Sequence, residues 1–162
     1  MARNVATEVA IKVLAADAGG SDGPLSRNTV VDYLDVLERL MIIENQPAWA
    51  PHMWSKAILR SLAKRHFVDP SLAVATMTGS PARLLLDLNL LGLLFESLVV
   101  RDLRIFAQPI DGQIFHYRDS NGLEVDTKKC GEPVLLAVIS GTGYGYVRPD
   151  GISVIPIGAL AP

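Results

Sequence analysis

The chain has 162 residues, of which 49% are hydrophobic and 20% charged, so it contains enough apolar residues to form a folded core. Its formal net charge of −2 excludes a general basic surface of the kind that binds nucleic acid. The single cysteine, Cys130, has no partner for an internal disulfide and no companion ligands for a metal, which fits a reducing compartment.

The sequence predicts neither a secretory signal nor a membrane span. Glu8 and Lys12 interrupt the apolar residues near the N-terminus, where a signal peptide needs a continuous apolar core. The most apolar stretch, residues 84–100, contains Asp87 and Glu96, which make it a poor membrane helix. We therefore expect a cytoplasmic protein without membrane contact.

The first 55 residues predict two helices and a wing-like loop. Apolar residues recur with helical spacing over residues 4–18, and a glycine-rich loop follows. Ser26 is suited to cap a second helix. Six apolar residues of that helix follow the helical period: Val30, Tyr33, Leu34, Leu37, Leu40 and Met41. An extended segment at residues 41–43 and a proline-rich loop around Trp49 complete a winged-helix-like module over residues 1–55.

Winged helices often bind DNA, but the second helix is poorly suited to it. Its exposed face begins with Arg27 and Asn28 and continues with three carboxylates, Asp32, Asp35 and Glu38. Carboxylates repel the phosphate backbone, so we expect a packing or protein-contact role and only weak DNA binding. The one basic run of the chain comes later: Lys56, Arg60, Lys64, Arg65 and His66. Such a run approaches a phosphate backbone in some proteins but is more commonly a solvated linker.

Beyond the module, the sequence predicts an α/β (α+β) core over residues 56–162. A strand at 66–68 precedes Asp69 and a proline, which start a short helix ending at Met77. Ser80, again followed by a proline, starts a long apolar helix over residues 84–106.

Glu96 is the unusual residue of this long helix. A helical projection surrounds it with apolar neighbours, among them Leu93, Val99 and Val100. A carboxylate in such a position costs several kcal/mol unless it is paired or protonated. We therefore expect Glu96 to be buried and to have partners.

Strands predicted at residues 105–107, 114–119 and 123–126 offer those partners. The strands at 114–119 and 123–126 form a hairpin whose register depends on the turn. A two-residue turn sets Tyr117 opposite Asp126, whereas a three-residue loop sets His116 opposite Asp126. The three-residue loop separates apolar from charged residues and is preferred. One face of the hairpin then carries four polar side chains: His116, Arg118, Glu124 and Asp126. The alternative interpretation of this face is a solvated surface with cross-strand ion pairs.

After Asp126 a polar connector leads to a continuous apolar run at residues 134–139, which predicts a strand buried on both faces. The glycine-rich segment 141–145 lacks the following helix and the Lys-Ser/Thr of a phosphate loop, so we interpret it as a turn. Residues 146–157 predict a closing hairpin.

Several stretches resemble the C-terminal half of a prokaryotic AAA-type ATPase family catalogued as domain of unknown function 4143. They are LSRNTVVDYL (25–34), KRHFVDP (64–70), GLLFE (92–96), YRD (117–119), GLEVD (122–126), GTGY (141–144) and PDG (149–151). The resemblance implies a winged helix followed by a PD-(D/E)xK nuclease-like core. It also implies that Glu96 is the acid of the core helix and Asp126 the first acid of a core strand.

Two departures from that family limit the expected chemistry. The chain has no phosphate loop, so the ATPase domain is absent and no ATP binding is expected. The strand with the family's Glu-x-Lys motif is also missing, because Asp126 runs directly into a Thr-Lys-Lys segment, so the nuclease-like core is truncated after Asp126. Lys128, which has the strand parity of Asp126, is the nearest substitute for the missing lysine.

The sequence therefore favours a non-catalytic recognition module without a cofactor, which binds a protein partner or a separate ATPase domain. No catalytic residue is assigned, and Glu96, Glu124 and Asp126 are vestigial candidates. The alternative is a nuclease-like or DNA-binding protein that uses Mg²⁺ held by Glu96 and Asp126, because clustered carboxylates hold Mg²⁺ in phosphodiester hydrolysis.

Overall fold

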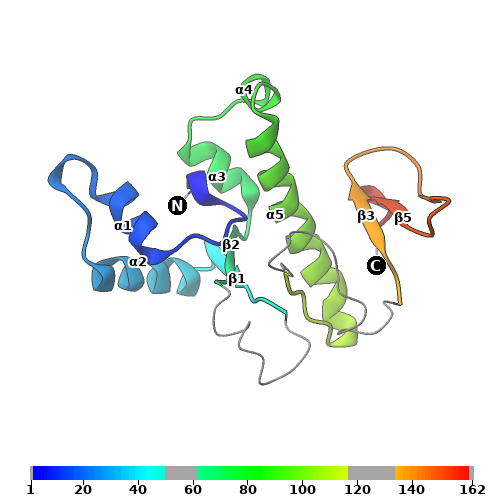
Figure 1. Ribbon diagram of the computed structural model, residues 1–162, viewed down its shortest axis with the longest axis horizontal. Helices are drawn as coiled ribbons and strands as arrows, with labels where there is room; N and C mark the ends of the chain where they lie inside the picture. Colours follow the sequence, from blue (N-terminus) through cyan, green and yellow to red (C-terminus); the bar gives the residue numbers. More distant parts are fainter. Residues whose placement is uncertain (1, 50–61, 117–133, 161–162) are drawn as a thin grey trace.

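The computed structural model describes residues 2–49, 62–116 and 134–160 and shows an α+β fold, as the sequence predicts (Figure 1). Its helices and strands are α1 (Ile11–Gly19), α2 (Arg27–Arg39), β1 (Ile43–Gln46), β2 (Lys64–Phe67), α3 (Pro70–Thr76), α4 (Pro81–Leu85), α5 (Leu88–Ala107), β3 (Ala137–Ser140), β4 (Tyr146–Val147) and β5 (Ser153–Pro156). Short 3-10 helices include η1 (Ala2–Asn4) and η3 (Gln108–Ile110).

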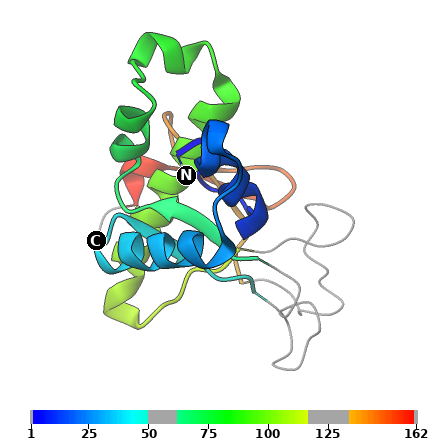
Figure 2. The ribbon, with the colours of Figure 1, turned by 90° about the vertical axis from the view of Figure 1, so that its left-hand side faces the viewer.

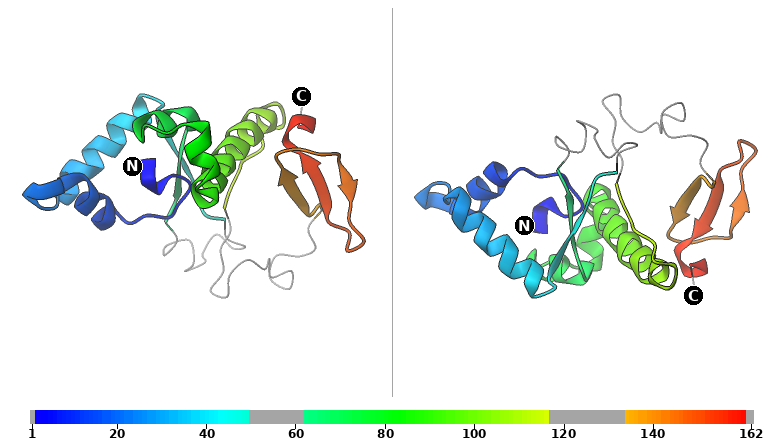
Figure 3. Two further views of the ribbon diagram at one scale, coloured as in Figure 1. Left: turned by 90° about the horizontal axis from the view of Figure 1, so that it is seen from above. Right: turned by 90° about the horizontal axis from the view of Figure 1, so that it is seen from below.

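The hairpin of β1 and β2 lies at the centre of the arrangement, between the α1–α2 pair on one side and α5 on the other (Figure 3). Figure 2 views the molecule from the α1–α2 end, with the hairpin and α5 behind. The strands are antiparallel, with Ile43 opposite Phe67 and Gln46 opposite Lys64. A strand does follow the second helix, but it covers residues 43–46 and not the predicted 41–43, because Met41, with a φ of 54°, lies in a turn. The predicted domain boundary at residue 55 falls between these two paired strands.

The first helix begins later than the sequence predicts. The residues between η1 and α1 form a turn and an isolated β-bridge from Thr7 to Arg65. Ala6, in the turn with a φ of 55°, donates its N–H to the carbonyl oxygen of Arg65 at 2.8 Å. The amide of Arg65 in turn donates to the carbonyl oxygen of Thr7 at 3.4 Å. These bonds to the edge of β2 replace the intrahelical bonds, and they bury Val5 completely.

The predicted capping signals are confirmed, and a further cap that was not predicted divides the long helix. Ser26 and Asp69 accept from the N–H groups of Thr29 and Ser71, at the starts of α2 and α3. The predicted continuous helix is wrong, because the Asp87 carboxylate accepts from the Leu90 N–H and starts α5 separately from α4. The predicted strand at 105–107 is also wrong, because these residues form the last turn of α5.

Two apolar clusters hold the N-terminal part together. One joins the hairpin to η1, α3 and α5: Val5, Ile43, Phe67, Ala73 and Leu94. The other joins α1 to α2: Val9, Leu14, Ala15 and Val30.

The C-terminal strands form a separate three-stranded sheet in the order β3-β5-β4 (Figure 3). The antiparallel pairing of β4 with β5 confirms the closing hairpin, and the glycine-rich segment connects β3 to β4 without helix. The predicted burial of residues 134–139 is wrong: Val134, Leu135 and Val138 are all exposed. A strand is buried on both faces only where other elements cover both faces of its sheet, and among the described elements β3 makes its main contacts with β5, its neighbour within the sheet. None of the described helices has the length and apolar character that crossing a membrane requires.

Candidate functional site

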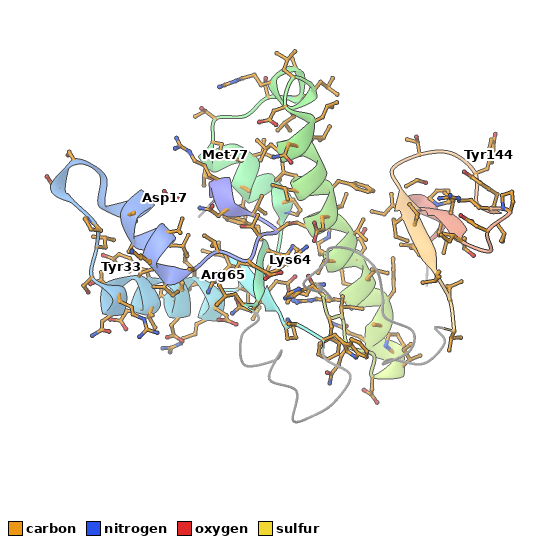
Figure 4. All side chains as sticks on the ribbon, viewed as in Figure 1. Asp17, Tyr33, Lys64, Arg65, Met77 and Tyr144 are labelled. Atoms are coloured by element: carbon orange, nitrogen blue, oxygen red, sulfur yellow. The ribbon has the colours of Figure 1, made fainter. Side chains whose placement is uncertain are left out.

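Glu96 lies on α5 and faces the hairpin, where its carboxylate accepts from the ammonium group of Lys64 at 2.6 Å. Figure 4 shows Lys64 on β2, beside α5. The side chain of Glu96 is 37% exposed, so the predicted burial is wrong, although the expected partner exists. The partner comes from the basic run. Arg118, Glu124, Asp126 and Lys128, the other residues proposed for this neighbourhood, lie outside the described residues.

A buried polar network lies next to this ion pair, between β1, β2 and α5. His66 and Ser97 are completely buried, and Gln46 is 4% exposed. The imidazole Nδ1 lies 3.0 Å from the Ser97 hydroxyl, and Nε2 lies 3.0 Å from the Gln46 side-chain oxygen. Because an amide oxygen only accepts, Nε2 carries the proton and Nδ1 accepts from the serine.

The surroundings of His66 keep its imidazole neutral. Burial lowers its pKa to about 4, and the positive charges of Arg104 and Lys64 and the ring of His116 act in the same direction. A serine bonded to a neutral histidine is the arrangement of an activated nucleophile. Here the serine is completely buried, so no substrate reaches it, and the network is a structural link between hairpin and helix.

Arg104 fixes the C-terminal half of α5 to the same hairpin. Its guanidinium forms an ion pair with Glu44 and donates to the carbonyl oxygen of Asn45 at 2.9 Å. Polar residues thus alternate along both strands on the face toward α5: Glu44 and Gln46 on β1, Lys64 and His66 on β2. Polar residues at every second position of a strand are a sequence signal for a polar packing face, and our sequence interpretation did not include it.

His116 occupies a different place from the predicted hairpin face. It is 6% exposed, and its backbone bonds to Pro47 and Trp49, which follow β1. Its Nε2 donates to the carbonyl oxygen of Leu62 at 3.1 Å, and its Nδ1 lies 3.6 Å from a carboxylate oxygen of Glu8. His116 therefore ties the segment after η3 both to the residues that flank the hairpin strands and to the segment between η1 and α1.

The outer face of α2 is the second candidate site. Arg27, Asn28, Asp32, Asp35 and Glu38 are exposed, as the sequence predicts. Only part of the predicted apolar face packs inward, because Tyr33, Leu40 and Met41 are 60%, 63% and 76% exposed. Val30 is buried, and Leu34 and Leu37 pack against the clusters instead.

Two of these exposed apolar side chains, Tyr33 and Leu40, form a row with Val36 at helical spacing, which we call the α2 stripe. Figure 4 shows Tyr33 on α2, at the opposite end of the molecule from Tyr144. Asp32 lies one helical turn before Val36, at the edge of the stripe, whereas Asp35 and Glu38 lie farther round the helix. Asp35 lies 3.8 Å from Arg39, and Glu38 accepts from the Asn45 amide at 2.9 Å.

Within the part of the chain that the structure describes, no three histidine, cysteine or acidic side chains are grouped so that they could hold a metal ion. The predicted Mg²⁺ site of Glu96 and Asp126 is not tested by this observation, because Asp126 lies outside the described residues. Glu96 by itself is already neutralised by Lys64, which a cation would have to displace.

Comparison with protein families corrects the resemblance drawn from the sequence. The matching family is Domain of unknown function (DUF8612), over residues 1–83, and not domain of unknown function 4143. No relationship to the AAA-type ATPase family is found, so the expectation of a separated ATPase half is wrong. Searches of curated proteins and of solved structures gave no match. The matched residues include α1, α2, the hairpin and α3, and the chain belongs to the DUF8612 family.

Proposed function

We propose that this chain is a non-catalytic recognition module that binds a protein partner through the α2 stripe. The observation that carries the proposal is the exposure of Tyr33, Val36 and Leu40 in one row on a helix whose other face packs in the core. Large apolar side chains in a contiguous exposed row favour protein contact. Tyrosine is a common anchor at such interfaces, because it buries a large area at low entropic cost.

The charges around the stripe favour one class of partner. Asp32 lies one helical turn before Val36, at the edge of the stripe, so this edge attracts a segment with lysine or arginine beside its apolar residues, and Asp35 and Glu38 add negative charge farther round the helix. An amphipathic helix of that composition fits an exposed helix face through residues at i, i+3 and i+7. The same carboxylates repel a phosphate backbone, so the charge favours protein over DNA.

A photo-crosslinking amino acid at position 36 tests the location, with position 105 on α5 as a control, since Val36 and Ile105 are 49% and 53% exposed. Adducts are expected from position 36 only. The crosslinked protein is then purified and its affinity measured for wild type, Tyr33→Ser and Tyr146→Ser.

The two tyrosines are matched in exposure, at 60% for Tyr33 and 59% for Tyr146. Tyr33→Ser should weaken binding at least about tenfold, the loss of one interface anchor, and Tyr146→Ser should leave it unchanged. Equal effects of the two substitutions, or equal adducts from both positions, would contradict the assignment to α2.

A further inference from the structure

A cavity of about 510 Å³ lies between η1, α3, α4 and the beginning of α5. It is separate from the α2 stripe: Figure 1 shows α4 at the top of the molecule and α2 at the lower left. Arg3 and Arg83 line it from two different elements. The remaining lining is partly apolar, with Met77 at the end of α3 (Figure 4) and Leu84 on α4.

The positive charges in this cavity are not balanced by the described residues. The guanidinium of Arg3 has no hydrogen bond or ion pair within the described ranges 2–49, 62–116 and 134–160. Arg83 donates only to the carbonyl oxygen of Thr78, at 3.3 Å. The one carboxylate in the lining, Asp87, accepts from the Leu90 N–H at 3.0 Å, where it caps α5. Two guanidinium groups therefore face the cavity with one carboxylate, which leaves the lining with a net positive charge.

The backbone that carries these arginines is fixed on both sides. Arg3 belongs to η1, where the next residue, Asn4, donates its amide to Asp17 at 3.0 Å and Val5 is completely buried. Arg83 is tethered by its bond to Thr78 and lies in the first turns of α4, which Ser80 caps. Because the backbone is already fixed, only the arginine side chains lose conformational entropy when they bind an anion.

The paired N–H donors of a guanidinium, its fork, match the oxygens of a phosphate or a carboxylate. The two ligand groups differ in how many guanidinium forks they can engage. One fork saturates the two oxygens of a carboxylate, whereas a phosphate monoester presents three oxygens that two forks can share. The threonine hydroxyls in the lining add acceptors, because Thr76 and Thr78 donate to the carbonyl oxygens of Ala73 and Met77 at 2.9 and 2.7 Å. Their lone pairs suit a ligand that also carries a hydroxyl or N–H donor.

We propose that this cavity binds a small phosphate monoester, with its phosphate between Arg3 and Arg83 and its apolar part against Met77 and Leu84. The site is formed largely by residues within the DUF8612 match. Its ligand is a small molecule, so the site is independent of the protein contact proposed at α2.

Titration of the full chain with phenyl phosphate, inorganic phosphate and benzoate, followed by calorimetry and by the ³¹P shift, tests the proposal. Phenyl phosphate should bind saturably at a single site and about tenfold more tightly than inorganic phosphate, which lacks the apolar part. Benzoate, which offers only a carboxylate on the same ring, should bind at least about tenfold more weakly than phenyl phosphate.

Variants locate the site. Arg3→Ala and Arg83→Ala should each weaken phenyl phosphate binding about tenfold or more, and Arg83→Lys should restore only part of the loss, because an ammonium cannot form the fork. Arg39→Ala is the matched control, since its side chain is 78% exposed and lies on α2. Circular dichroism verifies the fold of each variant. Absence of saturable binding, equal affinity for benzoate, or an equal loss in Arg39→Ala would overturn the proposal.

Discussion

The buried imidazole of His66 makes the stability of this protein depend on pH in a defined direction. Its pKa falls from 6.5 in the unfolded chain to about 4 in the folded protein, mainly because of burial. The unfolded state therefore binds more protons between these two values, and the free energy of unfolding falls as the pH falls through this window. Above pH 6.5 the imidazole is neutral in both states and the penalty is absent.

The size of the effect follows from the two pKa values. A difference from 6.5 to about 4 corresponds to a total loss of about 3 kcal/mol, at 1.36 kcal/mol per pKa unit, once the pH is below 4. Between pH 7 and pH 5 the same relation gives a loss of about 2 kcal/mol. For a domain with an ordinary stability of about 5–15 kcal/mol this is readily measured.

Urea unfolding at pH 7 and pH 5, for wild type and His66→Gln, isolates this contribution. Carboxylates titrate in both proteins, so their effects cancel in the comparison. His66→Gln should be less stable than wild type at pH 7, because the amide replaces only part of the contacts with Gln46 and Ser97. Its stability should, however, change about 2 kcal/mol less between the two pH values.

The imidazole titration can also be followed directly by NMR. The His66 resonances should not titrate between pH 7 and pH 5.5, whereas a pKa near 6.5 would show that the ring is not desolvated as described. An identical pH dependence of wild type and His66→Gln in urea would refute the reasoning in the same way.

Four further predictions concern the Asp87 cap of α5, the ion pair of Glu96 with Lys64, and the responses to Mg²⁺ and to ATP. Asp87→Ala should lower the unfolding free energy by about 1 kcal/mol through loss of the α5 cap, and a change below the error of urea titrations would argue against the separate helix start. Glu96→Gln should cost about 1 kcal/mol or less, because the partly exposed pair with Lys64 is solvated and the amide still accepts; a loss of several kcal/mol would mean a more buried charge. Calorimetry with Mg²⁺ should show no binding that Glu96→Gln abolishes, and such binding would support the nuclease-like alternative. ATP should not be hydrolysed, since the chain has no phosphate loop; phosphate release above the background of a protein-free control would disprove this.

The sequence by itself determined those local elements whose signals lie within a few residues of each other. Ser26, Asp69 and Ser80 identified three helix starts, because a cap is a contact between neighbours in sequence. The closing hairpin of β4 and β5 was predictable for the same reason, since its turn lies within a few residues. The need of Glu96 for a partner also followed from its position on the helix.

Tertiary structure decided which partner and which face each residue took. Lys64 precedes Glu96 by 32 residues, so only the packing of α5 on the hairpin could select it over the downstream residues that the sequence suggested. The same packing buried His66 and Ser97 together, although both are ordinary polar residues in the sequence. Tyr33 and Leu40 fit the helical period as core residues, yet they are exposed because α1 and the hairpin cover only the side of α2 with Val30. A helical pattern specifies a spacing, whereas burial depends on which other elements arrive at that face.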